Sequence, residues 1–469
     1  MNQSLQERLH LVLEQQRTAF AAEMSPSLAV RRDRLQRLGA MTRQYATELA
    51  EAIAADFSHR APQETLLADV YTVESGVNHA LCHLRSWMKP RRMPTAMQYL
   101  PASNRLLRQP LGVVGIVSPW NYPYYLAMAP ALAALAAGNR VMIKPSELTP
   151  QTSLLMARMV AEFFKPEEMQ VIIGDAEVGK VFTQLPFDHL FFTGSTPVGR
   201  LVAQAAAQHL TPVTLELGGK SPALIDRSCD LALTARRLAF GKLLNAGQTC
   251  VAPDYVLAPR ELVAPLAEAL QQAMRQLYPT LDTNPDYSAI ATPRHHARLQ
   301  GLLTDARERG AQLLPTHEEA MTGRKLTPHL LLDVNEEMAV MREEIFGPLL
   351  PIVAYDTPDE ALAYINRHDR PLALYWFGND RAARDHALAH SHAGGVTVND
   401  CIWHLGQEDQ PFGGVGASGM GSYHGEWGFR TFSKEKPVFI QSRFAGTALF
   451  YPPYGKTFDR LLALLKRIS

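Results

Sequence analysis

A chain of 469 residues is too long for one hydrophobic core, and its hydrophobic fraction of 46% is enough to fill two or three domains. Lysine and arginine number 46 in total, as do aspartate and glutamate, so the chain lacks the basic field that would attract nucleic acid or an anionic membrane. The four cysteines and the histidines have no paired or clustered spacing. We therefore expect free thiols in a reducing, cytoplasmic compartment and no bound metal.

Residues 1–88 have charged and apolar side chains at spacings of three to four, which predicts helices. A cluster of arginines in this segment is expected on a solvated face. Its members are Arg31, Arg32, Arg34 and Arg37. No basic stretch followed by an apolar stretch and a cleavage site is visible at the start, so we expect no secretory signal. A polar segment punctuated by Pro90 and Pro94 marks the first boundary.

Short apolar runs separated by helical stretches come next. They are residues 112–117, 140–143, 170–173 and 189–192. Apolar strands that alternate with helices are typical of a parallel sheet covered on both faces, so we predict a doubly wound, dinucleotide-type domain. The longest apolar stretch, 125–138, is interrupted by Pro130 and is shorter than the roughly 20 residues of a spanning helix. We interpret it as a buried helix and expect no membrane partner.

The second half of the chain repeats the α/β pattern. Asp230 is a plausible cap for a helix that runs to about Leu244, and strand-like runs follow at 254–257 and 395–398. A second α/β domain is therefore expected. Residues 460–468 form an amphipathic helix, which we expect to dock on the body of the protein.

Cys250 and Glu216 are the candidate catalytic pair. Glu216 lies in a glycine-flanked turn, 34 residues before Cys250. A thiol nucleophile and a carboxylate base are the two groups needed to form a covalent acyl-enzyme and then hydrolyse it. A cysteine taken alone is more often a small buried hydrophobe, so this interpretation depends on the motifs around it. Lys242, on the preceding helix, is either a cation that lowers the thiol pKa or, more simply, a solvated side chain.

Two candidate nucleotide sites follow predicted parallel strands. The segment 193–199 has Ser195 or Thr196 as a possible cap and Pro197 in a first helical turn, so its free backbone N–H groups can hold a phosphate; the alternative is a plain strand-to-helix turn. Lys144 and Glu147 follow the strand 140–143, at the edge where nucleotides bind in such sheets, and can contact an adenosine ribose. A surface ion pair between them is the alternative.

Asn121 is the candidate oxyanion donor. It lies in a rigid loop with two prolines and bulky aromatic side chains, 118–123, directly after a predicted strand. A neutral amide in such a loop can face a developing oxyanion, a role that contributes about 3 kcal/mol in acyl-transfer enzymes. An asparagine that only holds its own turn is the alternative.

These segments, together with 343–348 and 411–416, resemble the aldehyde dehydrogenase superfamily over nearly the whole chain. The segments 246–250, 419–425 and 451–454 look like its class 3 branch. The segment 407–410 and the region around Phe57 look closest to the bacterial coniferyl aldehyde dehydrogenases.

The resemblance implies a fold of two doubly wound parallel-sheet domains with a small β segment that bridges or oligomerises. The cofactor domain would comprise 1–88 and 106–213, and the catalytic domain 214–397. The bridging segments would be 89–105 and 398–445, followed by a tail helix over 446–469. A homodimer is implied as well.

The resemblance also implies the roles of single residues. Cys250 would attack the aldehyde, Asn121 and the Cys250 N–H would hold the oxyanion, and Glu216 would activate the hydrolytic water. NAD is the expected cofactor, with NADP possible. Its binding residues would be Trp120, Lys144, Glu147, Gly194, Ser195, Gly199, Glu344 and Phe346. The expected product is the free acid, because a carboxylate at position 216 favours water as the acyl acceptor.

The substrate expected from the resemblance is a planar aromatic aldehyde such as coniferyl aldehyde. The loop 399–406 departs from the class 3 pattern and is expected near the tail of the aldehyde. Candidate pocket residues are Tyr122, Tyr125, Trp403 and His404. Alternatives are a fatty, medium-chain or general aldehyde dehydrogenase and, from another class, a thiol esterase that works without NAD.

Overall fold

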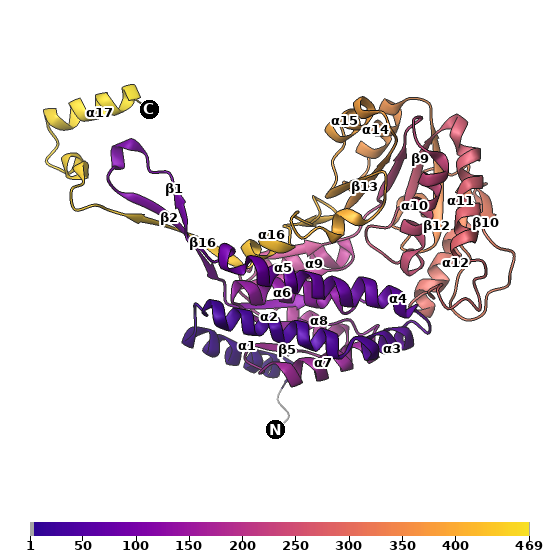
Figure 1. Ribbon diagram of the computed structural model, residues 1–469, viewed down its shortest axis with the longest axis horizontal. Helices are drawn as coiled ribbons and strands as arrows, with labels where there is room; N and C mark the ends of the chain where they lie inside the picture. The colour runs from indigo at the N-terminus through magenta and orange to yellow at the C-terminus, as the bar shows by residue number, and fades with distance from the viewer. Residues whose placement is uncertain (1–3, 469) are drawn as a thin grey trace.

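The structure, a computed structural model, describes residues 4–468 and contains two large β-sheets and one small sheet (Figure 1). The first large sheet has the order β15-β7-β6-β3-β4-β5 and is parallel except for β15, which runs antiparallel to β7. Its strands are β3 (Val113–Val117), β4 (Arg140–Lys144), β5 (Met169–Val171), β6 (His189–Thr193), β7 (Val213–Glu216) and β15 (Gly419–Met420). The four apolar runs predicted as strands are confirmed as β3 to β6, and β5 is shorter than predicted.

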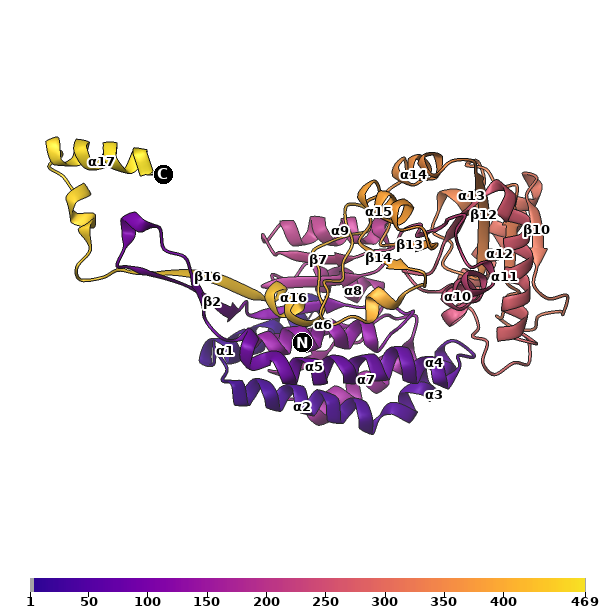
Figure 2. The ribbon, with the colours of Figure 1, turned by 45° about the horizontal axis from the view of Figure 1, so that its top comes forward.

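Alternate residues of these strands pack into two separate cores, since successive side chains of a strand point to opposite faces. Val141 and Ile143 of β4 pack in the core that contains α2, α5 and α6, whereas Met142 packs with α1, α8 and α9. In Figure 2, α2 and α9 lie on opposite sides of the sheet. The helices of this unit are α1 (Leu5–Ala22), α2 (Leu28–Gln44), α3 (Ala46–Asp56), α4 (Pro62–Thr65), α5 (Thr72–Trp87), α6 (Tyr125–Ala137), α7 (Pro150–Phe163), α8 (Ala176–Thr183) and α9 (Thr196–Ala207).

The second large sheet has the order β10-β11-β12-β9-β8-β13-β14, in which only β10 pairs antiparallel. Its strands are β8 (Pro222–Ile225), β9 (Tyr255–Pro259), β10 (Gln312–Pro315), β11 (His329–Leu332), β12 (Leu349–Tyr355), β13 (Ala373–Phe377) and β14 (Gly395–Val398). Its helices are α10 (Leu231–Leu243), α11 (Val263–Leu277), α12 (Pro293–Glu308), α13 (Ala339–Arg342), α14 (Pro358–Asn366) and α15 (Arg381–Ala389). Asp230 caps α10 as predicted, because its carboxylate accepts from the Leu233 N–H at 3.0 Å.

The small sheet is an antiparallel arm that joins distant parts of the chain. It pairs β1 (Arg91–Met93) with β2 (Ser103–Pro110), and β2 with β16 (Ser433–Ile440). The short helix α16 (Gly425–Thr431) precedes β16, so residues 398–445 supply strands both to the arm and, through β15, to the first large sheet.

The tail helix α17 (Lys456–Ile468) follows the arm and packs against η6 (Gly446–Phe450). Figures 1 and 2 both show α17 at the far end of the arm, away from the two large sheets. The expectation that the tail docks on the body is therefore wrong. The apolar side chain of Phe458 contacts Phe450 and Tyr454 of the tail itself instead.

Helix α6 is buried along its length, as predicted for the longest apolar stretch. Two arginines of the predicted solvated cluster are buried instead, each with 2% exposure, one of them at the end of α6. Arg31 donates to the Ala136 and Ala137 carbonyls, which a helix end leaves without intrahelical partners, and Arg34 pairs with Glu23 and Glu168. Among residues 4–468, the longest apolar helices are still too short or too polar to span a bilayer.

Candidate active site

Cys250 lies at the junction of two cavities. It follows α10 and the short helix η3 (Leu244–Gly247). One cavity, of about 330 Å³, has a mainly apolar lining, and the other, of about 670 Å³, is lined by charged and polar side chains as well. Cys250 and Glu216 line both cavities, together with Leu126, Thr193 and Leu217. The sequence-predicted nucleophile and base therefore share one space that opens toward two different chemical environments.

The Cys250 thiol is protonated in this environment. Burial raises its pKa to about 12, and the neighbouring carboxylates of Glu344 and Glu216 add to the shift because they disfavour a second negative charge. Lys242 is buried rather than solvated: its ammonium donates to the Pro253 carbonyl at 3.0 Å, and burial lowers its pKa to about 8. The expectation of a solvated lysine at this position is wrong, because α10 packs this side against the loop before β9.

Glu216 ends β7, next to β6 on one side and β15 on the other. Its side chain is 3% exposed, and burial raises its pKa well above the ordinary value. Within the described part of the chain, neither carboxylate oxygen has a hydrogen-bond partner. A buried carboxylate without a partner costs free energy, so both oxygens are available to a water or substrate atom between the cavities.

Asn121 lies beside Cys250 because backbone and side-chain bonds tie the two loops together. Its Nδ2 donates to the Gln248 carbonyl at 3.1 Å, and its own carbonyl accepts from Asn245 Nδ2 at 3.0 Å. The first bond fixes the orientation of the amide. One N–H of that amide remains to donate to an oxyanion on the carbon that Cys250 attacks.

The larger cavity brings together most of the predicted cofactor residues. Trp120, Gly194, Ser195, Glu344 and Phe346 all line it. The Trp120 ring stacks on His295 at 4.5 Å and meets the edge of Phe346 at 5.4 Å. Lys144, Glu147 and Gly199 lie outside this lining; the Lys144 ammonium donates to the Pro145 carbonyl and is 3.9 Å from the Glu147 carboxylate.

The start of α9 and the turn after Glu216 fit a dinucleotide. Ser195 is the first residue before α9, but within residues 4–468 no side chain caps the helix start, and the Thr196 hydroxyl donates to Ala417 O instead. The uncapped N–H groups therefore remain for a phosphate. A Cβ on Gly218 would lie 2.1 Å from Glu344 Oε2, so a larger residue at this position would displace this carboxylate.

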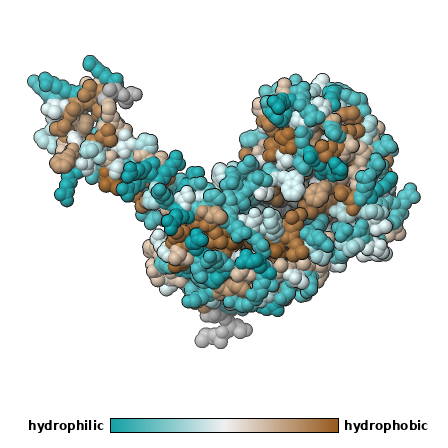
Figure 3. Space-filling view, viewed as in Figure 1, coloured by the Kyte–Doolittle hydropathy of each residue, from teal (hydrophilic) through white to brown (hydrophobic). Residues whose placement is uncertain are grey.

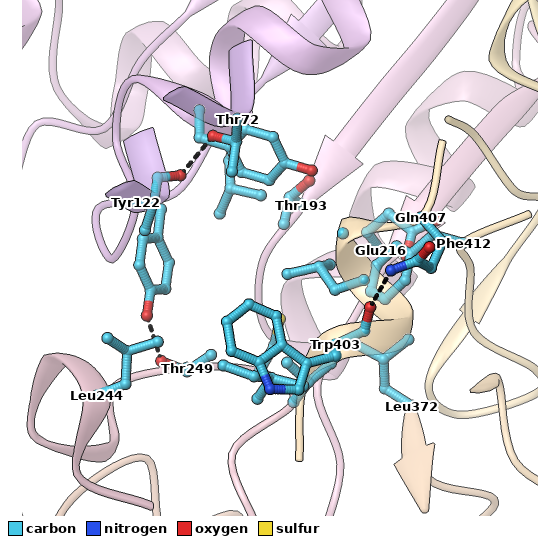
Figure 4. A pocket seen from close by; sticks show the side chains of 18 of the residues that line it. Thr72, Tyr122, Thr193, Glu216, Leu244, Thr249, Leu372, Trp403, Gln407 and Phe412 are labelled. Atoms are coloured by element: carbon cyan, nitrogen blue, oxygen red, sulfur yellow. Dashed lines mark hydrogen bonds between the residues drawn. The ribbon is translucent and has the colours of Figure 1, made fainter. Parts of the chain in front are cut away.

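The smaller cavity is lined mostly by aromatic and aliphatic side chains (Figure 4). Tyr122 and Trp403 point into it, and the Tyr122 hydroxyl bonds Thr249 Oγ1 at 2.6 Å. Trp403 also stacks on Phe240 at 6.2 Å, and Tyr125 lines the cavity as well, whereas the fourth predicted residue, His404, is not part of the lining. His404 packs behind the loop, where it bonds Thr397 Oγ1 at 2.7 Å and burial lowers its pKa to about 4.

Several residues of this lining were missed by sequence reasoning. They are Leu67, Ala68, Tyr71, Thr72, Phe240, Leu244, Leu372, Gln407, Glu408, Phe412 and Tyr423. The first four come from the π-helical turn η1 (Leu66–Tyr71) and the start of α5. Their only signal in the sequence is an apolar pattern typical of any helix, so nothing assigned them to a substrate site.

The fold and the comparisons define a class of protein, an NAD(P)-dependent oxidoreductase. The aldehyde dehydrogenase family model matches residues 1–438, and the chain belongs to this family. It is 48% identical to the probable coniferyl aldehyde dehydrogenase of Pseudomonas aeruginosa over 98% of this chain and 97% of that protein. It is 44% identical to the coniferyl aldehyde dehydrogenase of Pseudomonas sp. strain HR199, over 98% and 96%.

A solved structure agrees with this assignment. The AldH of Staphylococcus aureus, solved in a substrate-bound state, superimposes with a TM-score of 0.92 at 35% identity, covering 97% of this chain and 99% of that one. The expected fold class and the expected activity of an NAD(P)-dependent aldehyde dehydrogenase are confirmed. The alternative of a thiol esterase that works without NAD is not favoured by these relatives.

Proposed function

We propose that the chain oxidises an aldehyde to its carboxylic acid through a covalent intermediate on Cys250. The single observation that supports this most is that Cys250 and Glu216 both line the polar and the apolar cavity. The aldehyde enters from the apolar side, the Cys250 sulfur bonds to its carbonyl carbon, and the thiol proton passes to solvent water through the polar cavity. Asn121 Nδ2 and the Cys250 N–H hold the resulting oxyanion of the thiohemiacetal.

Five residues of the larger cavity, together with Lys144, Glu147 and Gly199 outside its lining, hold the cofactor in this proposal. Gly194, Ser195 and Gly199 bind its phosphates at the start of α9, Lys144 and Glu147 bind the adenosine ribose, and Trp120, Glu344 and Phe346 bind the nicotinamide end. When bound, NAD or NADP accepts the hydride that leaves the thiohemiacetal carbon, which leaves a thioester on Cys250. The 44% exposed carboxylate of Glu147 would repel a 2′-phosphate, so NAD is the first choice and NADP remains open.

Glu216 completes the cycle as the general base. Its partnerless oxygens accept a proton from water, the water oxygen attacks the thioester carbon, and the Cys250 thiolate leaves and is reprotonated. The product is the free acid. Absorbance at 340 nm after mixing protein, NAD and a simple aldehyde tests the scheme: a rise is expected, and no rise with any aldehyde would contradict it.

We further propose coniferyl aldehyde, or a similar planar phenylpropanoid aldehyde, as the substrate. Two Pseudomonas relatives are named for this activity, and Trp403, Phe240, Tyr122 and Phe412 supply flat apolar faces around the cavity. A steady-state comparison of coniferyl aldehyde with decanal, each with NAD and with NADP, tests this. A higher kcat/KM for coniferyl aldehyde is expected, and a preference for decanal would favour the fatty-aldehyde alternative.

The proposed assembly is a homodimer that buries the arm. Figure 3 shows apolar surface at the outer end of the arm, where Phe444 is 89%, Tyr451 65% and Phe439 49% exposed. A monomer rarely exposes so many large apolar side chains together. Sedimentation of the full chain should give a dimer, and a monomer at micromolar concentration would contradict the proposal.

A reducing, cytoplasmic compartment is proposed as well, because Cys82, Cys229, Cys250 and Cys401 are free.

A further inference from the structure

A buried carboxylate from the N-terminal helices contacts the loop that precedes Cys250. Glu64, the third residue of α4, is 9% exposed. One of its oxygens accepts from the backbone N–H of Asn245 at 2.9 Å, and the other accepts from the Ser288 hydroxyl at 2.6 Å. These two partners are 181 and 224 residues away along the chain. Glu64 therefore joins three segments that meet only in the folded protein.

The backbone that Glu64 holds is unusual. Asn245 and Ala246 both have left-handed conformations, with φ of +53° and +51°. Two successive residues other than glycine in this region are unfavourable and persist only where surrounding contacts fix them. The Glu64 carboxylate supplies such a contact at the first of the two, five residues before the nucleophile.

The same loop positions the oxyanion amide. Asn245 Nδ2 donates to Asn121 O at 3.0 Å and to Gln248 O at 3.3 Å, and Gln248 O also accepts from Asn121 Nδ2. A shift of Asn245 therefore moves Asn121 and the backbone next to Cys250 together. These contacts link Glu64 to Asn121 and to the backbone near Cys250 through Asn245.

Two charged residues near Glu64, Arg60 and Asp69, contact the loop that contains Asn121 and the start of α6. Arg60 is fully buried, pairs with Asp69 at 3.1 Å, and lies 4.8 Å from the centre of the Tyr122 ring and 4.0 Å from a Glu64 oxygen. Asp69 in turn accepts from the N–H groups of Tyr124 and Tyr125. The N-terminal segment thus contacts the loop before Cys250 through Glu64, and the loop that contains Asn121 through Arg60 and Asp69.

We propose that Glu64 is a positioning residue for the acylation step: it holds the loop before Cys250 so that the sulfur and Asn121 Nδ2 face the same carbonyl group. This role rests on the functions proposed above for Cys250 and Asn121. Glu64 itself lines neither cavity and touches no reacting atom. Its removal should slow the first turnover while leaving cofactor binding unchanged.

The test compares Glu64→Ala, Glu64→Asp and Glu64→Gln in the full chain, with the rate constant of the NADH burst as the main measurement. Glu64→Ala should lower this rate constant by about 10- to 100-fold, the range expected when a reacting group is misplaced by about 1 Å. Glu64→Asp keeps the buried carboxyl group but withdraws the acceptor from Asn245, so it should be slow as well. Glu64→Gln keeps an acceptor oxygen in place and should restore the rate to within a few-fold of the wild type.

Glu168→Ala is the matched control, because Glu168 is also a largely buried carboxylate, but its partners are Arg34 and Arg37 of α2 and not the loop before Cys250. This variant should lose thermal stability but keep the burst rate. NAD affinity, measured by binding, should be unchanged in all Glu64 variants.

A wild-type burst rate in folded Glu64→Ala or Glu64→Asp would overturn the proposal, as would a Glu64→Gln variant that is as slow as Glu64→Ala. Should Glu64→Ala fail to fold, the Asp and Gln variants decide the matter by the same criterion. A further measurement combines Glu64→Ala, or Glu64→Asp, with Asn121→Ala: the double variant should be less impaired than the product of the single effects, and a multiplicative result would contradict action through Asn121. Failure of the wild type to form NADH with any aldehyde would instead contradict the proposed function, so the two failures are distinguishable.

Discussion

The two cavities that meet at Cys250 are built in different ways. The larger one is formed where parallel strands end and helices begin, by short motifs such as the start of α9 and the turn after β7. The smaller one collects single side chains from η1, α5, α6, α10 and the loop 402–412. In the proposed scheme, the chemistry lies in contiguous segments fixed by the sheet, whereas the selection of the aldehyde depends on residues scattered over the chain.

The strongest test of this comparison is removal of the sulfur that joins the cavities. Cys250→Ser should reduce aldehyde oxidation by at least about 10⁴-fold, because the hydroxyl is a far weaker nucleophile without an activating base. NAD binding and the melting temperature should stay near the wild-type values. Near-normal turnover, measured as NADH formation, would remove Cys250 from the scheme and leave the two cavities without a chemical link.

Glu216→Gln is expected to have the next largest effect and to separate the two half-reactions. Acylation should still give a burst of NADH, but steady-state turnover should fall by about 10²- to 10⁴-fold, since no general base activates the water. Loss of the burst with this variant would assign Glu216 to acylation instead.

The pH profile of the wild type also tests whether Glu216 is the base of thioester hydrolysis. Burial raises the pKa of Glu216, so its carboxyl is protonated at low pH and becomes a base only as pH rises through that raised pKa. The rate of thioester hydrolysis should therefore increase with pH until well above the ordinary range of a glutamate, and this rise should be absent in Glu216→Gln.

The sequence was sufficient to predict four strands of the first large sheet, two strands of the second and five residues of the polar cavity, because those features are local. A run such as 140–143 and the polar residues after it are contiguous, so strand, edge and binding residue follow from one short pattern. Cys250, Glu216 and Asn121 were identified in the same way, and the structure brings them to one junction.

The remaining features depend on contacts between distant segments. Arg31 and Arg34 look like solvated charges in a helix, but their burial depends on carbonyl groups at the end of α6 and on Glu168. Lys242 is buried by the loop before β9. The position of α17 depends on the arm rather than on its own amphipathic pattern, and the lining from η1 has no distinctive motif. None of these contacts is visible in the spacing of residues along the chain.

Trp403→Ala tests whether the scattered lining selects the substrate. Loss of the ring and of its stacking on Phe240 should raise KM for coniferyl aldehyde by about tenfold, in line with about 1 kcal/mol for an aromatic contact plus the apolar area lost. Acetaldehyde is the control substrate, since it is too short to reach beyond Cys250, and its KM should change less than twofold. Equal changes for both aldehydes would mean that Trp403 supports the loop and does not select the substrate.

The smallest expected effect concerns the charge on the polar side of the junction. Burial raises the pKa of Glu344 to about 8, and its carboxylate in turn raises the pKa of the Cys250 thiol. Below pH 8 Glu344 is protonated and neutral, so wild type and Glu344→Gln should be alkylated by iodoacetamide at Cys250 at similar rates. Above pH 8 the wild-type carboxylate is ionised and suppresses the thiolate, so the variant should react about three- to tenfold faster. Glu343→Gln is the matched control, because that carboxylate is 51% exposed and pairs with Arg298, and it should leave the rate unchanged. Rates that differ equally at pH 6.5 and pH 9.5 would show that the two cavities are not coupled through this charge.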